Sequence, residues 1–241
     1  MSSLNNVPCT GGDGSGRLSF DPLNIVICGI GGQGNVLASE LVSSTMNDLG
    51  FKVAVGETYG AAQRGGSVMS HVRVSASYEM GVLIPKGEAH FIIGFEPLET
   101  LRLARQYAGP QTRIIYDPRP VYPQGVLQGR QVYPDLKAMD EEIASLSGEA
   151  VKVPAAEIAM ECGDSRAANI ALLGAFSTLP GTPLSSEELL EVLRQRFSGA
   201  VLEMNERVFA RGCSVMHISD ADPEKESGCA GDAEQKGGVS G

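Results

Sequence analysis

Short apolar runs separated by turn residues recur along the middle of the chain. Residues 24–28 form a continuous apolar run that ends in glycines, which is typical of a central parallel strand buried on both faces. Apolar residues then recur at helical spacing over 38–49, with Gly50 suited to a C-terminal cap. A second apolar run follows at 51–55. These three segments predict one βαβ unit.

The segment 67–75 alternates between two kinds of side chain and therefore predicts a strand with unequal faces. One face carries Val68, Ser70, Val72 and Val74, and the other carries Met69, His71 and Arg73. His71 and Arg73 could take part in catalysis, because both project from the polar face of one strand. We prefer a contact with another subunit, since arginine is enriched at such interfaces.

The remaining segments continue the alternation of strands and helices. We expect strands at 91–95, 113–116 and 151–153, a helix opened by Glu96 and Pro97, a loop at 119–133, a buried helix at 167–176, a helix ending at Arg196 behind a Ser185–Glu188 capping box, and a short helix at 205–211 that stops at Gly212. This order predicts an α/β fold: a mostly parallel, Rossmann-like sheet with helices on both faces.

The two ends of the chain differ from its middle. Residues 1–20 and 219–241 are small, polar and rich in glycine, so we expect a disordered leader and a disordered tail around one domain at 21–218. Four units of the net charge of −10 lie in the tail, which has six acids and two lysines from Asp220 onward. The chain has no tryptophan and no basic run, so nucleic acid is not an expected partner.

Neither a membrane span nor a metal site is expected. No apolar run reaches the ~20 residues that cross a bilayer, and the N-terminus lacks the regions of a signal peptide, which favours a cytoplasmic protein. The five cysteines, Cys9, Cys28, Cys162, Cys213 and Cys229, form no CxxC pair. An iron–sulfur cluster needs several thiolates at close spacing, so we expect reduced, structural thiols and no cofactor bound by this chain alone.

A glycine-rich turn follows the first predicted strand and opens the first predicted helix. Gly29, Gly31 and Gly34 satisfy GxGxxG, and Gly32 and Gln33 complete the turn. Backbone amides at a helix start can bind phosphate or carboxylate, so these five residues are the predicted cofactor-binding site. The alternative is that the glycines only allow the helix and the strand to pack closely.

More specific interpretations of this turn differ in their support. A P-loop requires Lys followed by Ser or Thr after the last glycine, and Asn35 and Val36 stand there instead. A dinucleotide fold requires an acid about 20 residues later, and Glu57 is near that position. A stand-alone NAD-binding oxidoreductase is therefore the alternative function. A GDG sequence at 12–14 lies in the polar leader, and we attribute it to chance composition.

A second distinctive segment lies between the strands predicted at 51–55 and 67–75. It contains Gln63, Arg64, Gly65 and Gly66, which place one guanidinium beside permissive backbone. Arginine suits the bidentate capture of carboxylate or phosphate, so these four residues are predicted to contact an anion, a substrate or a subunit interface. The alternative is a structural ion pair of Arg64, for example with Glu57.

Three stretches together resemble a known family. GIGGQGN from Gly29, YGAAQRGGSVMSHVRVS from Tyr59 and LIPKGEAHFIIGFEPLETLR from Leu83 are similar to the gamma-type domain of 2-oxoacid:ferredoxin oxidoreductases, and most similar to the small (beta) subunit of the indolepyruvate type. The similarity covers residues 24–212. One departure is His90, where relatives commonly have an acid; we expect it to form a local hydrogen bond at a strand entry.

The resemblance implies a reaction and a division of labour. A 2-oxoacid, typically an aryl pyruvate such as indolepyruvate, is decarboxylated on thiamine diphosphate, two electrons pass through iron–sulfur clusters to ferredoxin, and coenzyme A takes the acyl group. The family's larger subunit carries thiamine diphosphate, Mg²⁺ and [4Fe-4S] clusters. The resemblance also implies that Gly31–Gly34 contact a pyrophosphate or carboxylate, and that Arg64 anchors an anion near the interface between the subunits.

Overall fold

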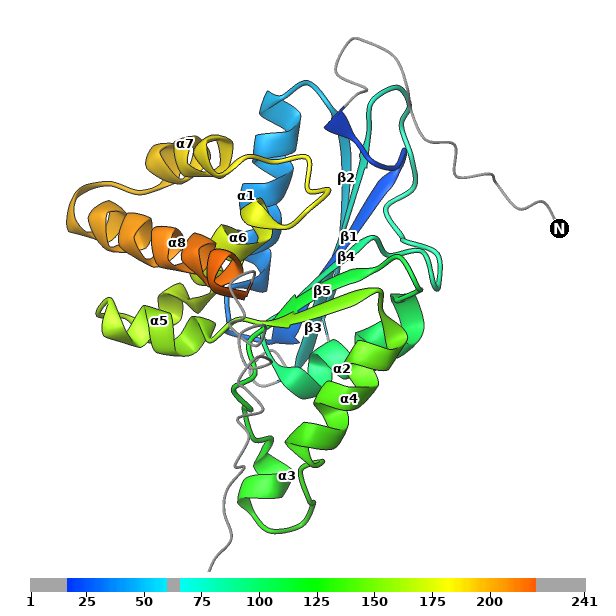
Figure 1. Cartoon of the computed structure of the whole chain (residues 1–241), viewed down its shortest axis with the longest axis vertical. Coiled ribbons are helices and arrows are strands. Elements are labelled where there is room, and N and C mark those ends of the chain that lie inside the picture. Colours follow the sequence, from blue (N-terminus) through cyan, green and yellow to red (C-terminus); the bar gives the residue numbers. More distant parts are fainter. Residues whose placement is uncertain (1–16, 60–65, 220–241) are drawn as a thin grey trace, which may run out of the picture.

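One mixed sheet organises the computed structural model of the chain, which describes residues 17–59 and 66–219 (Figure 1). Its strands are β1 (Leu23–Ile30), β2 (Lys52–Tyr59), β3 (Ser67–Ser75), β4 (Phe91–Gly94), β5 (Arg113–Tyr116) and β6 (Glu149–Lys152). The order across the sheet is β2-β3-β1-β4-β5-β6. The pairs β1–β4, β4–β5 and β5–β6 are parallel, and β3 runs antiparallel to both of its neighbours, β1 and β2.

Helices cover both faces of this sheet, as predicted (Figure 1). One face carries α1 (Asn35–Asp48), α5 (Ala155–Glu161), α6 (Ala168–Thr178), α7 (Ser186–Arg196) and α8 (Gly199–Ser219); the other carries α2 (Pro97–Tyr107) and α4 (Leu136–Leu146). Alternate residues of β1 supply the two cores, because Ile25 and Ile27 pack on the first side and Val26 and Cys28 on the second. A short helix, α3 (Gln124–Leu127), lies beyond the sheet in the connection that follows β5.

The position of β3 corrects two expectations. β1 and β2, the two strands of the predicted βαβ unit, are parallel but not adjacent, because β3 lies between them in the sheet. His71 does not make the predicted subunit contact, because this chain itself buries its side chain. The subunit contact of Arg73, whose side chain is half-buried, stays a prediction. His71 is buried, accepts a hydrogen bond from the Ile84 amide and packs edge-on against Tyr107. The Arg73 guanidinium donates to Asn24 and to carbonyls of the connection after β3.

The last helix is longer than predicted. α8 continues past Gly212, where the helix was expected to stop. This glycine lies at the point where α8 crosses α6. A Cβ atom at Gly212 would lie 2.0 Å from the Ala171 carbonyl oxygen, and one at Gly174 would lie 2.2 Å from the Phe209 carbonyl oxygen. Two glycines therefore allow the two helix backbones to approach closely.

Ordered packing begins before residue 21, where the domain was expected to start. Leu18 is buried in the core, and the Phe20 ring stacks on His90 with centroids 3.9 Å apart. His90 accepts a hydrogen bond from the Asn24 amide, so its predicted local hydrogen bond is confirmed. Burial lowers the pKa of His90 to about 4, and the ring is neutral at neutral pH. The expected disorder of residues 1–16 and 220–241 lies outside the described residues.

Candidate functional site

The strand order creates a crevice at the carboxyl ends of β1 and β4. β1 and β4 are neighbours, but β1 leads through α1 on one face of the sheet and β4 leads through α2 on the other. Ligands of open α/β sheets bind where connections diverge in this way. A cleft of about 470 Å³ lies at this place in the structure.

The floor of the cleft is made by the loops that follow the parallel strands. Gly32 and Gln33 follow β1, Phe95 follows β4, Asp117 follows β5 and Ala156 follows β6. One wall comes from the connection after β5, through Arg119, Pro120, Val121, Tyr122 and Leu127, and the other from Ser165, Arg166 and Ala168 between α5 and α6. The cleft thus combines arginines with aromatic and aliphatic side chains.

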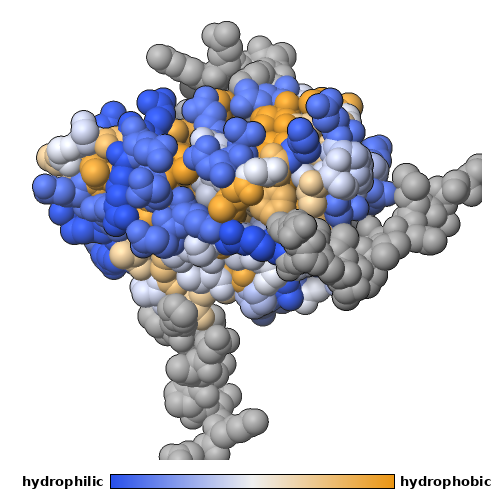
Figure 2. All heavy atoms as spheres, turned by 90° about the horizontal axis from the view of Figure 1, so that it is seen from above, coloured by the Kyte–Doolittle hydropathy of each residue, from blue (hydrophilic) through white to orange (hydrophobic). Residues whose placement is uncertain are grey.

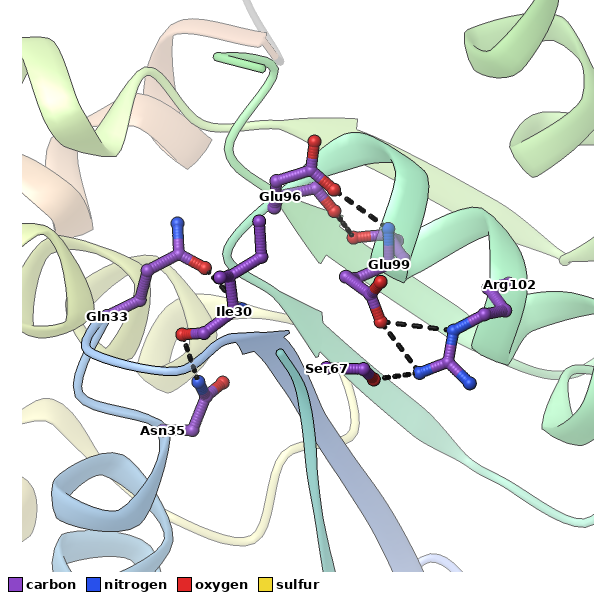
Figure 3. Close-up of polar contacts among 8 residues, drawn as sticks. Ile30, Gln33, Asn35, Ser67, Glu96, Glu99 and Arg102 are labelled. Atoms are coloured by element: carbon purple, nitrogen blue, oxygen red, sulfur yellow. Dashed lines mark hydrogen bonds and ion pairs between the residues drawn. The ribbon is translucent and has the colours of Figure 1, made fainter. Parts of the chain in front are cut away.

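Gln33 joins the glycine turn to the neighbouring strand. Its Oε1 accepts a hydrogen bond from the Ile30 amide at 2.6 Å (Figure 3). Its Nε2 donates to the Phe95 carbonyl oxygen at 2.9 Å. Asn35 donates from Nδ2 to the Ile30 carbonyl oxygen at 3.3 Å. The side chains of the turn therefore bind its own backbone and that of the β4 end, which holds the floor of the cleft rigid.

The glycines of the predicted site have different roles. A Cβ atom at Gly29 would lie 2.9 Å from that of Phe95, and one at Gly34 would lie 2.5 Å from Asn169 Nδ2, so these two permit close packing. The Gly31 amide donates to the Gly66 carbonyl oxygen. Gly32 has a φ of +105° and open space around its Cβ position. Of the five predicted residues, Gly32 and Gln33 line the cleft.

The two predicted motifs meet at one hydrogen bond. Gly66 ends the Arg-bearing segment, and its bond with Gly31 joins it to the glycine turn. Gln63, Arg64 and Gly65 lie outside the described residues. Ser67 begins β3 directly after this segment and accepts a hydrogen bond from Arg102 of α2, which also pairs with Glu99 at 2.6 Å (Figure 3).

Glu96 joins the β4 end to the wall of the cleft. Its carboxylate is buried and accepts hydrogen bonds from the Glu99 amide at 2.9 Å, the Val121 amide at 3.4 Å and the Tyr133 hydroxyl. The first bond caps α2, whose start at Glu96 and Pro97 was predicted from the proline. Burial raises the pKa of Glu96 above its ordinary value, and the hydrogen bonds act in the opposite direction.

Asp117 has a similar role at the end of β5. Its Oδ1 accepts from the Arg119 amide at 3.0 Å, and its Oδ2 accepts from the Ala156 amide at 2.8 Å. Burial raises its pKa above the ordinary value. Asp117 therefore positions the backbone of Arg119 relative to the start of α5, on two sides of the cleft.

The Glu96→Gln variant is expected to be less stable by about 1 kcal/mol, because one glutamine oxygen cannot accept from both the Glu99 amide and the Tyr133 hydroxyl in the arrangement of the carboxylate. The raised pKa means that the folded state favours the protonated carboxyl. The stability that this preference adds is fully present below the pKa that Glu96 has in the unfolded chain. It is lost as the pH rises through the higher pKa that Glu96 has in the folded chain. Urea unfolding should therefore show a larger difference in free energy of unfolding between the wild type and Glu96→Gln at pH 5 than at pH 8. A difference that grows with pH would contradict the raised pKa of Glu96.

The geometry does not favour the NAD-binding alternative. The acid of a dinucleotide fold stands at the end of the strand beside β1, but β3 occupies that place and Glu57 is one strand further away. Glu57 instead accepts a hydrogen bond from Ser39 of α1 at 3.4 Å. The predicted pair of Glu57 with Arg64 falls outside the described residues.

The cysteines and acids of the described residues do not form a metal site. Residues 17–59 and 66–219 contain no group of three or more His, Cys, Asp and Glu side chains that could hold a metal ion. Cys28 is buried in the sheet, which raises the pKa of its thiol, and Cys162 and Cys213 are free thiols in the helical layer. In this part of the chain no helix has the length and apolar character needed to cross a bilayer.

Comparisons with known proteins point in one direction. Residues 24–215 match the family model described as pyruvate ferredoxin/flavodoxin oxidoreductase. The chain is 37% identical over 190 residues to the indolepyruvate oxidoreductase subunit IorB of Thermococcus kodakarensis, covering 78% of this chain and 93% of that protein. The IorB subunit of Methanothermobacter thermautotrophicus is 32% identical over 189 residues, with 78% and 95% covered.

Solved structures share the fold. The 2-oxoglutarate:ferredoxin oxidoreductase of Magnetococcus marinus aligns with a TM-score of 0.64 and 25% identity. The alignment covers 84% of this chain but only 32% of that longer chain. The keto/oxoacid ferredoxin oxidoreductase gamma subunit of Geobacter sulfurreducens PCA aligns with a TM-score of 0.59 and 20% identity, covering 81% of this chain and 99% of that one.

Proposed function

Because the chain belongs to the pyruvate ferredoxin/flavodoxin oxidoreductase family, we propose that it is the small subunit of a heteromeric 2-oxoacid:ferredoxin oxidoreductase that acts on an aryl pyruvate such as indolepyruvate. The reaction converts the 2-oxoacid and coenzyme A into acyl-CoA and CO2, and passes two electrons to ferredoxin. The observation that carries this proposal is the 37% identity that extends over 93% of the Thermococcus IorB subunit.

The cofactors of this reaction belong to a larger partner subunit in our proposal. Cys28 lies inside the sheet, whereas Cys162 and Cys213 lie in the helical layer, so the described thiols do not fit an iron–sulfur cluster, which needs several thiolates at one point. Thiamine diphosphate, Mg²⁺ and the clusters are therefore assigned to the partner. This chain supplies binding and orientation, as proteins do around cofactors.

The surface around the cleft supports a contact with that partner. Among the described residues, most of the exposed large apolar side chains belong to the connection after β5 and to the helices beside it: Val121, Tyr122, Leu127, Val132, Leu136 and Met160. A concentration of exposed apolar side chains marks an interaction site. Figure 2 looks down on the end of the molecule away from α3, where several apolar areas lie between hydrophilic residues. We propose that Gly32, Gln33 and the segment from Gln63 to Gly66 face the partner at the cleft end.

Co-purification tests this function. A tagged copy of the full chain, isolated from its native host without oxygen, is expected to bring down a larger protein that contains thiamine diphosphate and iron. Thiamine and iron analysis of the eluate provides the measurement, and an unrelated tagged protein provides the control. Recovery of the chain by itself, under conditions where its host makes 2-oxoacid oxidoreductases, would contradict the proposal.

A further inference from the structure

We propose that a second copy of this chain pairs with it through the edge strand β2, so that the two β2 strands run antiparallel about a two-fold axis at Val55. β2 is at the opposite edge of the sheet from β6, so this surface differs from the one that we assign to the larger subunit. The self-association goes beyond the proposed function and does not depend on it.

β2 is a long edge strand that lacks the usual protection along its centre. In the part of the chain that the structure describes, β3 is its only neighbour, and the two strands pair without a bulge from Lys52–Ser75 to Tyr59–Val68. Edge strands of natural proteins are usually short, bulged, or interrupted by proline or lysine. β2 has eight residues, no proline, and one lysine at its first position. Its open edge is therefore suited to the addition of another strand.

The hydrogen-bonding pattern of the sheet shows which backbone groups face this edge. The Gly31 amide donates to the Gly66 carbonyl oxygen, which continues the register of β1 with β3. Odd-numbered residues of β1 therefore bond to even-numbered residues of β3, because the backbone groups of successive residues point to alternate sides of a strand. The same alternation across β3 directs the N–H and C=O groups of Val53 and Val55 away from β3, to the open edge. A second strand would bind to these groups.

The centre of the proposed pair is apolar on both faces of the sheet. An axis at Val55, which is 37% exposed, places this residue opposite its own copy and places Ala54 opposite Gly56 of the second copy. On the other face Val82 lies against β2, because a Cβ atom at Gly56 would lie 3.0 Å from the Val82 Cβ. Pairing therefore brings the Val82 residues of both copies close to the axis and removes apolar surface from water.

The distribution of exposed apolar side chains supports this location. Five of those in the described residues lie outside the surface assigned to the larger subunit, and four of the five belong to β2 or to the connection after β3: Val55, Tyr78, Val82 and Leu83. Arg73 Nη1 donates to the carbonyl oxygens of Gly81 and Leu83 at 2.9 and 3.1 Å, which holds this connection against the sheet. A second concentration of exposed apolar side chains marks a second interaction site.

The charges of β2 favour an antiparallel pair of identical strands. In the proposed register Lys52 of one copy lies opposite Thr58 of the other and one residue from Glu57, so charges of opposite sign are close. The two Lys52 residues lie at opposite ends of the paired strands. A parallel pair in register would instead bring like charges side by side, which destabilises a sheet. A two-fold axis also makes every favourable contact twice.

Sedimentation of the full chain tests the pairing. The wild type is expected to form a reversible dimer. Val55→Lys should weaken this dimer by about tenfold or more, which corresponds to about 1.4 kcal/mol, because two like charges would meet at the axis. Val55→Pro should have a similar effect, because it removes an amide at the open edge and no hydrogen bond to β3. Val201→Lys, at an exposed position of α8, is the matched control and should dimerise like the wild type.

A cysteine at the axis locates the contact. Val55 and its copy form a hydrogen-bonded pair in the proposed register, with Cα atoms about 5.5 Å apart, which is within the range that a disulfide spans. Val55→Cys should therefore give a disulfide-linked dimer under mild oxidation, whereas Val201→Cys should not. Mass analysis of the linked peptides separates this link from any that the native cysteines form.

Three results would overturn the proposal. These are a wild type that remains monomeric at about 100 µM, a dimer that Val55→Lys leaves unchanged, or no link between copies of Val55→Cys. Circular dichroism confirms that each variant folds, and Val55→Lys keeps the test valid if Val55→Pro does not fold. Recovery of the larger subunit by co-purification is a separate result, so the strand pairing and the proposed function can fail independently.

Discussion

The Gly212→Val variant is expected to lose about 3 kcal/mol of folding free energy or more, because it adds atoms where two helix backbones touch. The added Cβ would lie 2.0 Å from the oxygen and 2.8 Å from the carbon of the Ala171 carbonyl group. These are backbone atoms of α6, which cannot turn aside as a flexible side chain can. The variant can fold only if α8 moves away from α6 and leaves part of the buried helical core loosely packed.

Helix propensity acts in the opposite direction but is smaller. Valine is a better helix former than glycine by less than about 1 kcal/mol, so the steric term decides the sign. Guanidinium unfolding of the full chain, followed by circular dichroism, measures the loss. Ala210→Val, at an exposed position of the same helix, is the matched control and should change stability by less than about 0.5 kcal/mol. A Gly212→Val variant as stable as this control would show that the crossing is not tight.

Most strands were predictable because the centre of the sheet is buried on both sides. The apolar runs at 24–28, 91–95 and 113–116 correspond to β1, β4 and β5, whose residues meet helices on either face. The alternation at 67–75 gave the bounds of β3, but its antiparallel direction depends on pairing with β1 and β2, which local pattern does not encode.

Helices α4 and α5 were not predicted from the sequence. α4 has apolar residues at helical spacing, Leu136, Met139, Ile143 and Leu146, so its pattern was there to be found. α5 has only seven residues, which is too short for a clear apolar period. Gly212 was interpreted as a helix end because glycine commonly follows one. Its actual role depends on α6, whose contacting residue Ala171 is about forty positions away in the sequence.

The candidate site was predictable only in part, for a similar reason. The glycine turn has a motif within six residues, and Gly32 and Gln33 of that motif do line the cleft. Arg119 and Arg166 carry no comparable local signal, because they come from two loops that only the order of the strands brings together. The Asp117–Pro118 pair after a buried strand is the one local indication that backbone near Arg119 is constrained.

The second large effect concerns activity. The chain without a partner is expected to reduce no ferredoxin with a 2-oxoacid, because its described thiols cannot form the cluster path that carries single electrons. Addition of the chain to its larger subunit should raise the rate from background to on the order of 1 s⁻¹ or faster, which is typical of enzymes. The rate should require coenzyme A and should be higher with indolepyruvate than with pyruvate.

Reconstitution without oxygen is the most direct measurement of the central claim that this chain completes a 2-oxoacid oxidoreductase. The larger subunit obtained by co-purification is loaded with thiamine diphosphate, Mg²⁺ and iron–sulfur clusters, and ferredoxin reduction by indolepyruvate and coenzyme A is followed with and without this chain. Background rates are expected for either protein alone, and full turnover is expected for the pair. Full turnover by the larger subunit alone, or none by the loaded pair, would contradict the assignment of this chain as a required subunit.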